Sequence, residues 1–199
     1  MKIIVVGASG TIGKAVVAAL SGDHEIIKVG SKSGDAQVDI KDSGSIRKLF
    51  EKVGKFDALI STVGKAHFGE FAKVTEAEVQ IGIKDKLMGQ VNLVLIGRDY
   101  ANDGASFTLT TGVLNDDPIR YGACASLVNG ALDAFVKAAA IELPRGLRIN
   151  SISPGVLEES LGSYGPYFKG HEAVPAKRVA NAYVKSVEGL LTGEVIKVR

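Results

Sequence analysis

The chain has 199 residues, 24 Lys and Arg against 22 Asp and Glu, and a formal net charge of +2 at pH 7. It is 46% hydrophobic and 23% charged, which is typical of a globular chain long enough for one domain. The positive and negative charges are balanced and scattered, which excludes a basic surface for binding nucleic acid. No uninterrupted apolar run reaches the ~18 residues of a membrane span. The single cysteine, Cys124, excludes an internal disulfide. We therefore expect one cytoplasmic domain over residues 1–199, with no membrane and no nucleic acid as a partner.

The first predicted strand, residues 2–6, is a β-branched run of the kind that is buried in a parallel sheet. A glycine-rich loop and a helix follow it. Further strands are predicted at 25–29, 36–40, 56–60, 106–110, 147–153 and 194–198, and further helices at 43–53, 76–96, 123–142 and 178–187. Strands alternating with helices in one series predict an α/β fold with a single doubly wound parallel sheet of about seven strands, Rossmann-like in type.

Glycine is the outlying residue type, with 24 in the chain, and three glycines fall in the loop after the first strand. A strand that turns into a helix through such a loop is typical of a phosphate site, because the helix N-terminus presents unpaired N–H groups. We expect a dinucleotide to bind here, at Gly7, Ser9, Gly10, Thr11, Ile12 and Gly13. The alternative interpretation is a turn that only lets the helix pack closely.

A nucleoside-triphosphate loop is excluded by spacing. Five residues rather than four separate Gly7 from the Gly13-Lys14 pair, and Ala15 stands where a metal-binding hydroxyl is required. The end of the second strand indicates which dinucleotide is preferred. Ser31 and Lys32 stand where an NAD site usually has an acid, and no acid occurs before Asp35, so NADP is favoured over NAD.

At this point the sequence resembles the short-chain dehydrogenase/reductase family over nearly its whole length. Besides the glycine loop, the matching segments are Asp39-Ile40, Ser61-Thr62-Val63-Gly64, Ala139 to Leu143, Leu147 to Gly155 and Thr192 to Ile196. The resemblance implies further cofactor contacts at Asp39, Ile40, Ser61, Thr62, Val63, Gly64, Pro154, Gly155 and Val156. The chain is shorter than most family members, and no helix is expected between the second and third strands.

The family's chemistry uses Asn, Ser, Tyr and Lys, with the last two in a Tyr-x-x-x-Lys pattern that this sequence does not contain. Two alignments are open. Counting back from Glu142 places the tyrosine position at Ala125 and the lysine position at Asn129, and this alignment keeps the Pro-Gly turn ungapped. Alternatively Tyr121 is the family tyrosine, and Ala125 then replaces the lysine.

The resemblance places the serine position near Thr111 and the family asparagine at Lys86. Lys86 and Asn129 then look like an exchange of Asn and Lys between two helices, and Lys86 would supply a cation near the nicotinamide ribose. The alternative is that Lys86 is an ordinary surface charge. Candidate catalytic residues are therefore Thr111, Lys86, Tyr121 and Asn129, and the proton could also come from His67 or a bound water.

Two functions are open from the sequence. One is a divergent NADP(H)-dependent oxidoreductase acting on a carbonyl compound or alcohol, and the other is a catalytically silent nucleotide-binding sensor or regulatory protein. A small molecule of unknown structure is the expected substrate. Tyr164, Tyr167 and Phe168 could form a lid over it, or they could be ordinary packing under a loop. The resemblance also suggests a homodimer or homotetramer through the helices at 76–96 and 123–142. The three histidines are too far apart in sequence to suggest a metal site.

Overall fold

The computed structural model describes residues 1–199, and its seven strands form one parallel sheet in the order β3-β2-β1-β4-β5-β6-β7. This confirms the predicted doubly wound α/β fold. The strands are β1 Lys2–Val6, β2 Glu25–Gly30, β3 Ala36–Gln37, β4 Phe56–Ser61, β5 Ala101–Thr110, β6 Arg148–Pro154 and β7 Val195–Val198. The strand order reverses between β1 and β4, and in such sheets ligands bind at this switch point, beyond the carboxyl ends of the strands.

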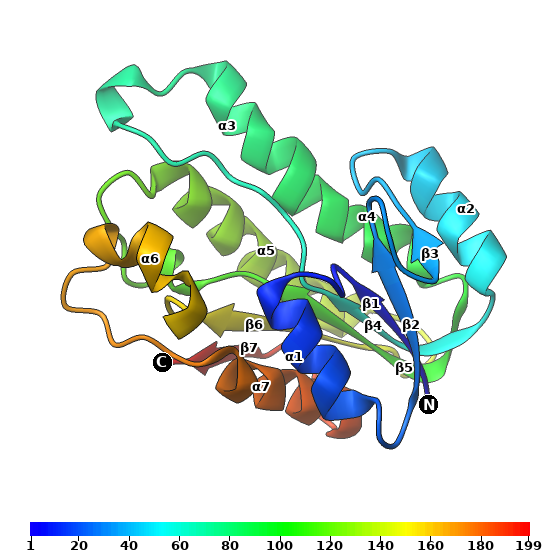
Figure 1. Ribbon diagram of the computed structural model, residues 1–199. Coiled ribbons are helices and arrows are strands. Elements are labelled where there is room, and N and C mark those ends of the chain that lie inside the picture. The colour runs from blue at the N-terminus through cyan, green and yellow to red at the C-terminus, as the bar shows by residue number, and fades with distance from the viewer.

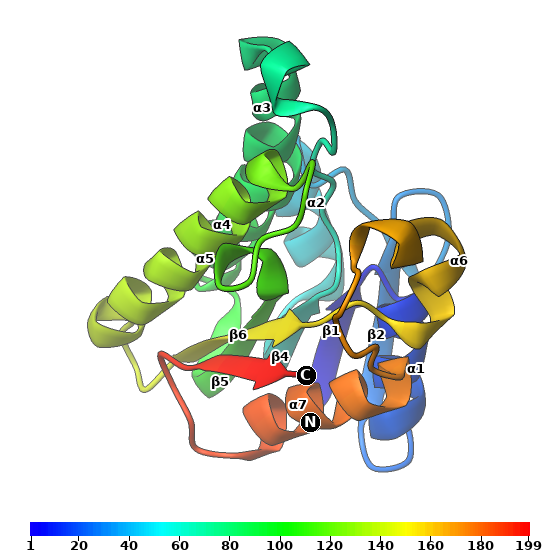
Figure 2. The same cartoon turned by 90° about the vertical axis from the view of Figure 1, so that its left-hand side faces the viewer.

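Helices cover both faces of the sheet (Figures 1 and 2). They are α1 Thr11–Leu20, α2 Ser43–Val53, α3 Glu76–Gly82, α4 Met88–Gly97, α5 Ala123–Glu142, α6 Leu161–Tyr164 and α7 Ala176–Glu188. Helices α1 and α7 pack on one face, and α2, α4 and α5 pack on the other. Short 3-10 turns lie at η1 Phe71–Lys73, η3 Val113–Asn115, η4 Glu158–Ser160 and η5 Gly165–Tyr167.

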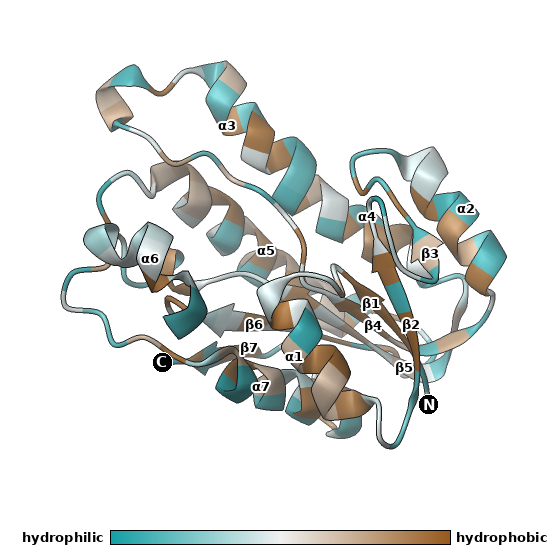
Figure 3. Cartoon of the chain, in the orientation of Figure 1, coloured by the Kyte–Doolittle hydropathy of each residue, from teal (hydrophilic) through white to brown (hydrophobic).

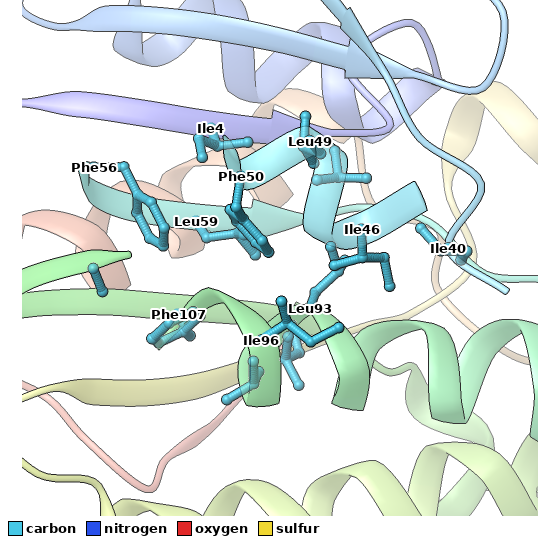
Figure 4. Packing of buried hydrophobic residues seen from close by; sticks show 14 of the residues in the cluster. Ile4, Ile40, Ile46, Leu49, Phe50, Phe56, Leu59, Leu93, Ile96 and Phe107 are labelled. Carbon is cyan, nitrogen blue, oxygen red and sulfur yellow. The ribbon is translucent and has the colours of Figure 1, made fainter. Parts of the chain in front are cut away.

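Alternate residues of the strands supply the two halves of the core, and Figure 3 shows the central strands as the most hydrophobic part of the chain. On the α2 side, Phe50 stacks against Phe56 with ring centroids 5.6 Å apart, and Phe107 meets Phe56 edge-on (Figure 4). Burying these rings removes a large apolar area from water, so this half of the core fixes α2 and α4 against the sheet.

The third strand is shorter than the sequence predicts. A strand over 36–40 is expected, but β3 ends at Gln37, because its partner strand β2 ends at the paired residue Gly30. Asp42 N then donates to the Asp39 carbonyl where the chain turns toward α2. The Asp42 side chain caps α2 by accepting from Gly44 N at 2.8 Å. Residues 31–35 alone join β2 to β3, in agreement with the expected absence of a helix there.

The predicted helix over 76–96 is present, but it is not regular. It runs from Glu76 to Gly97 as α3, a π-helical turn η2 at Ile83–Leu87, and α4. In Figure 1 its N-terminal end stands out from the body of the protein. Single π turns inside helices widen the helix by one residue and occur often at functional sites. Lys86 lies in this turn.

Helix α5 has the bounds that the sequence predicts, Ala123–Glu142. It is the one helix long and apolar enough by composition to cross a membrane, although polar residues interrupt its apolar sequence. In the structure it packs against β6, and its buried Asp133 accepts from Ser151 Oγ at 2.8 Å and from Asn115 Nδ2 at 2.9 Å. These contacts are those of a core helix.

Candidate active site

An open cavity of about 450 Å³ lies at the carboxyl ends of β1, β2 and β4, where the strand order reverses. Its lining is mostly polar or backbone, as an extended nucleotide requires. The residues are Val6, Gly7, Ser9, Gly10, Gly30, Ser31, Val38, Asp39, Ile40, Lys41, Thr62, Val63, Gly64, Lys65 and Asp85.

The glycine loop packs closely against the end of β4 and against the first turn of α1. Gly7 has a φ of +92°, and a Cβ atom there would lie 2.6 Å from Thr62 Oγ1. Gly10 N donates to the Gly7 carbonyl at 3.0 Å, and a methyl group on Gly13 would overlap that same carbonyl. Because Gly10 precedes α1 without a capping side chain and the first turn has no acid, the helix N-terminus remains available to an anion.

The structure brings together most of the predicted cofactor contacts. Nine of them line the cavity, namely Gly7, Ser9, Gly10, Ser31, Asp39, Ile40, Thr62, Val63 and Gly64. Thr11, Ile12 and Gly13 form the first turn of α1, and Lys32 lies exposed in the loop after β2. Ser61 and Val156 are buried beside the site rather than in its wall. Sequence reasoning missed Lys41, which follows the Asp39-Ile40 pair and lines the cavity.

A second pocket of about 190 Å³ adjoins the first, and Gly64 lines both. It holds three of the candidate catalytic residues, Lys86, Thr111 and Asn129, together with Pro154 and Gly155. Its remaining walls are backbone or apolar, and they are Ala66, Phe68, Gly112, Val113, Leu114, Ala125 and Phe168. One charged side chain therefore faces a small, largely apolar space.

Side chains from two helices hold the chain where it leaves β5. Gln90 Nε2 donates to the Thr110 carbonyl at 2.8 Å, Lys86 Nζ to the Thr111 carbonyl at 2.8 Å, and Asn129 Nδ2 to the Gly112 carbonyl at 3.3 Å. Three consecutive carbonyls are thus bound by polar side chains. This fixes the position of Thr111, whose hydroxyl is 3.4 Å from the Ile152 carbonyl.

Lys86 is half-buried as a residue, but its ammonium group lies inside the protein. Gly64, with a φ of +125°, packs so closely on it that a Cβ atom would lie 2.6 Å from Lys86 Cγ. Burial lowers the pKa of Lys86 to about 8, and the carboxylate of Asp133 partly opposes this shift by favouring the charged form. An ammonium group with such a pKa can donate a proton near neutral pH.

Asn129, which lines this pocket, has an unused hydrogen-bonding atom. The residue is 2% exposed, and its Oδ1 has no partner within the protein. Because buried amide oxygens normally accept a hydrogen bond, Oδ1 fits a bound group that presents a hydroxyl or an N–H. Lys86 beside it is a donor, so the two suit a ribose hydroxyl, which can both donate and accept.

Tyr121 is not in this pocket. It precedes α5 in the loop and lines a separate hollow with Arg120 and Ile119. His67 is also absent from the pocket wall and lies 3.6 Å from a Glu78 carboxylate oxygen. Tyr183 is fully buried beneath β5, where desolvation raises the pKa of its hydroxyl. Lys86 is thus the titratable side chain that lines the pocket.

Residues 11–187 match the family model described as Enoyl-(Acyl carrier protein) reductase. A short-chain dehydrogenase/reductase of Stachybotrys chlorohalonatus is 27% identical over an alignment of 190 positions that covers 77% of this chain and 72% of that protein. The chain belongs to the short-chain dehydrogenase/reductase family. Members of this family are oxidoreductases, and an uncharacterized oxidoreductase of Methylorubrum extorquens is 27% identical over 76% of this chain and 71% of its own length.

Solved structures agree with this assignment. The protein lin1944 from Listeria innocua is 51% identical, with a TM-score of 0.99 over 100% of both chains. A small-chain dehydrogenase in complex with NADPH is 27% identical, with a TM-score of 0.88 over 100% of this chain and 96% of that chain. The short-chain dehydrogenase fold is therefore retained across the whole chain.

The pocket can be compared with the family's tyrosine and lysine positions. In the alignment that keeps the Pro-Gly turn ungapped, Ala125 takes the tyrosine position and Asn129 the lysine position, and both residues line the pocket. In the other alignment Tyr121 takes the tyrosine position, and it lies in the separate hollow. The first alignment thus places both positions in the pocket, and the second places only Ala125 there.

Proposed function

We propose that this protein is an NADP(H)-dependent oxidoreductase that reduces a carbonyl compound to an alcohol, with Lys86 as the proton donor. The observation that supports this proposal most directly is the position of Lys86. It lines the pocket that shares Gly64 with the dinucleotide cavity. We also propose that it acts in the cytoplasm, since its one cysteine is unpaired.

A nicotinamide cofactor held in the dinucleotide cavity would supply the hydride for the carbonyl carbon. Lys86 transfers a proton from Nζ to the carbonyl oxygen and is reprotonated from solvent, so that one hydride and one proton convert the carbonyl to an alcohol. The hydroxyl of Thr111 is the second group able to donate a hydrogen bond to the developing oxyanion. The apolar walls, Phe68 and Phe168 among them, exclude water and strengthen both contacts.

The residues present fit a nicotinamide dinucleotide. Gly7 and Gly13 leave no room for side chains between loop and strand, and the uncapped start of α1 suits a pyrophosphate. The partnerless Oδ1 of Asn129 and the remaining N–H groups of Lys86 would hold the nicotinamide ribose. The relative that was solved with NADPH supports the same cofactor here.

A preference for NADPH over NADH is supported by the charges around the end of β2. Asp35, the first acid after this strand, accepts from Lys28 N at 2.8 Å and is thereby tied to the sheet edge. Lys41 lines the cavity, although Asp39 Oδ1 lies 3.9 Å from its Nζ, and Lys32 is exposed nearby in sequence. These two cations suit a 2′-phosphate.

We expect the double variant Lys32→Ala/Lys41→Ala to bind NADPH more weakly while its NADH affinity stays unchanged. Exposed ion pairs contribute about 0.2–1 kcal/mol each, so the combined loss in NADPH affinity should be roughly two- to thirtyfold. Fluorescence titration of both cofactors measures it. Equal losses for NADPH and NADH would contradict a phosphate contact.

The pH dependence follows from the lowered pKa of Lys86. Carbonyl reduction needs the protonated ammonium, so kcat/KM should be constant at low pH and fall as the pH rises through about 8. Steady-state assays from pH 6 to pH 10, roughly two pH units on either side of the lowered pKa, test this. A profile that stays flat past pH 9 would exclude Lys86 as the proton donor.

We also propose that two copies associate through α3, α4 and α5. Ile81, Met88 and Leu95 recur at seven-residue spacing on the long helix and are 47%, 39% and 40% exposed, and Leu127 on α5 is 51% exposed. A groove of about 270 Å³ between α4 and α5 is lined by Leu95, Phe135 and Ala138, among others. Gly130, Ala131 and Ala134 would let a partner helix approach closely.

Substituting Leu127→Glu should therefore yield monomers, because it places a charge in the apolar contact. Light scattering after size exclusion compares it with the unmodified protein, which we expect to be dimeric or tetrameric. A matched control, Lys48→Glu, lies on the exposed side of α2. An unmodified protein that is monomeric at micromolar concentration would contradict the proposed association.

A further inference from the structure

Tyr121 has an unusual backbone conformation. Its φ is +71°, in the left-handed region that a bulky residue rarely adopts. The chain is held in this shape by a hydrogen bond from Gly69 N to the Tyr121 carbonyl at 3.1 Å, and α5 begins only two residues later. Backbone strain of this kind persists where surrounding contacts stabilise it, and it occurs often at functional positions.

The contacts that use the side chain of Tyr121 come from its ring. The ring meets that of Tyr167 edge-to-face, with centroids 5.8 Å apart and planes at 73°. The guanidinium carbon of Arg120 lies 4.8 Å from the ring centroid of Tyr121. Tyr167 belongs to η5, and the next residue, Phe168, lines the pocket of Lys86. Tyr121 thus contacts the segment that forms one wall of that pocket.

This segment, residues 158–173, has little regular structure of its own. It contains the short turns η4, α6 and η5, and we refer to it as the covering loop. Besides the Tyr121 contact, Tyr164 packs against Phe68 with ring centroids 5.9 Å apart, and His171 Nδ1 lies 3.4 Å from Asp117 Oδ2. A few side-chain contacts therefore determine how closely the covering loop lies over the pocket.

We infer that Tyr121 is a positioning residue whose ring docks the covering loop, and so places Phe168 against the bound substrate. The inference rests on the proposed function only in taking the pocket of Lys86 as the substrate site. It assigns Tyr121 no part in proton transfer. The ring is needed and the hydroxyl is not.

The variants Tyr121→Gly and Tyr121→Phe separate these roles. Glycine accepts the left-handed backbone but removes the ring, whereas phenylalanine keeps the ring and removes the hydroxyl. Chymotrypsin cleaves after exposed aromatic residues, and Tyr164 and Tyr167 in the covering loop are 43% and 47% exposed. We expect Tyr121→Gly to be cleaved in this loop roughly two to ten times faster than the unmodified protein, because an aromatic pair is lost. Tyr121→Phe should be cleaved at the unmodified rate.

Turnover gives a second readout. Tyr121→Gly should raise KM for the carbonyl compound by a similar two- to tenfold factor, with kcat nearly unchanged, and Tyr121→Phe should leave both constants unchanged. Tyr167→Ala removes the other ring of the pair and also one of the two chymotrypsin sites, so cleavage after Tyr164 is the rate that is compared among the variants. This rate should rise in Tyr167→Ala as it does in Tyr121→Gly, also if Tyr121→Gly does not fold. In the double variant Tyr121→Gly/Tyr167→Ala the two effects should not add.

Two results would overturn the inference: a cleavage rate that neither Tyr121→Gly nor Tyr167→Ala changes, or a loss of kcat in Tyr121→Phe of about 100-fold or more, as expected of a proton donor. If the unmodified protein reduces no carbonyl compound, the proposed function fails, and the cleavage rates still decide whether Tyr121 docks the covering loop.

Discussion

Replacing Lys86 with methionine is expected to lower kcat for NADPH-dependent carbonyl reduction by 10²- to 10⁴-fold, about 3–5 kcal/mol of activation free energy. Methionine keeps an unbranched side chain next to Gly64 but can neither donate a proton nor carry charge. Steady-state and single-turnover rates of NADPH oxidation measure the effect. The cofactor should also bind more weakly, by roughly tenfold or more, if the ammonium group contacts the ribose, since hydrogen bonds to charged groups contribute about 1.5–3 kcal/mol.

The matched control for this variant is Lys84→Met. Lys84 lies in the same π turn, but its side chain is exposed, so its loss should leave kcat and NADPH affinity unchanged. If Lys86→Met kept the unmodified kcat, Lys86 would not be the proton donor. If it bound NADPH with unchanged affinity, the contact with the ribose would be wrong, whatever the rate.

Replacing Gly13 with alanine is expected to weaken NADPH binding. The added methyl group would overlap the Gly7 carbonyl and lie 2.9 Å from Ala8 Cα, and these are backbone atoms that cannot move without displacing the loop. Overpacking costs about 1–3 kcal/mol, so we expect a loss in affinity of roughly 5- to 150-fold. Fluorescence titration of NADPH is the measurement.

Gly22→Ala serves as its control, because a Cβ atom at Gly22 meets nothing within 4 Å. Thermal unfolding of both variants separates a displaced loop from a destabilised domain. A Gly13→Ala protein that binds NADPH as tightly as the unmodified chain would contradict the placement of the cofactor on this loop.

The fold could be predicted from the sequence because the local signals agree. Apolar β-branched strands alternate with helices of apolar spacing, such as that from Ala123 to Glu142, and this alternation predicts one parallel sheet. The exceptions are places where tertiary contacts outweigh the pattern. Val38 and Ile40 read as strand residues, yet they are buried beyond the end of β3, where a Cβ atom at Gly89 would be only 2.7 Å from Ile40 Cδ1.

The site could be predicted less completely. The cofactor loop can be predicted from the spacing of its glycines, because only glycine lets the backbone come close to the pyrophosphate of the cofactor. A π turn has no comparable sequence signal, so the inward direction of Lys86 and its lowered pKa required the structure. The same holds for Tyr121, whose neighbour Tyr167 is distant in sequence, and for the adjacent carbonyls that Lys86 and Asn129 hold.

The most direct test of the account is NADPH oxidation by the unmodified protein with a panel of small apolar aldehydes and ketones. We predict NADPH oxidation that depends on the carbonyl compound and forms one alcohol for each NADPH consumed. The Lys86→Met variant should lose this activity. Tight binding of NADPH with no turnover of any carbonyl compound would contradict an oxidoreductase function for this site.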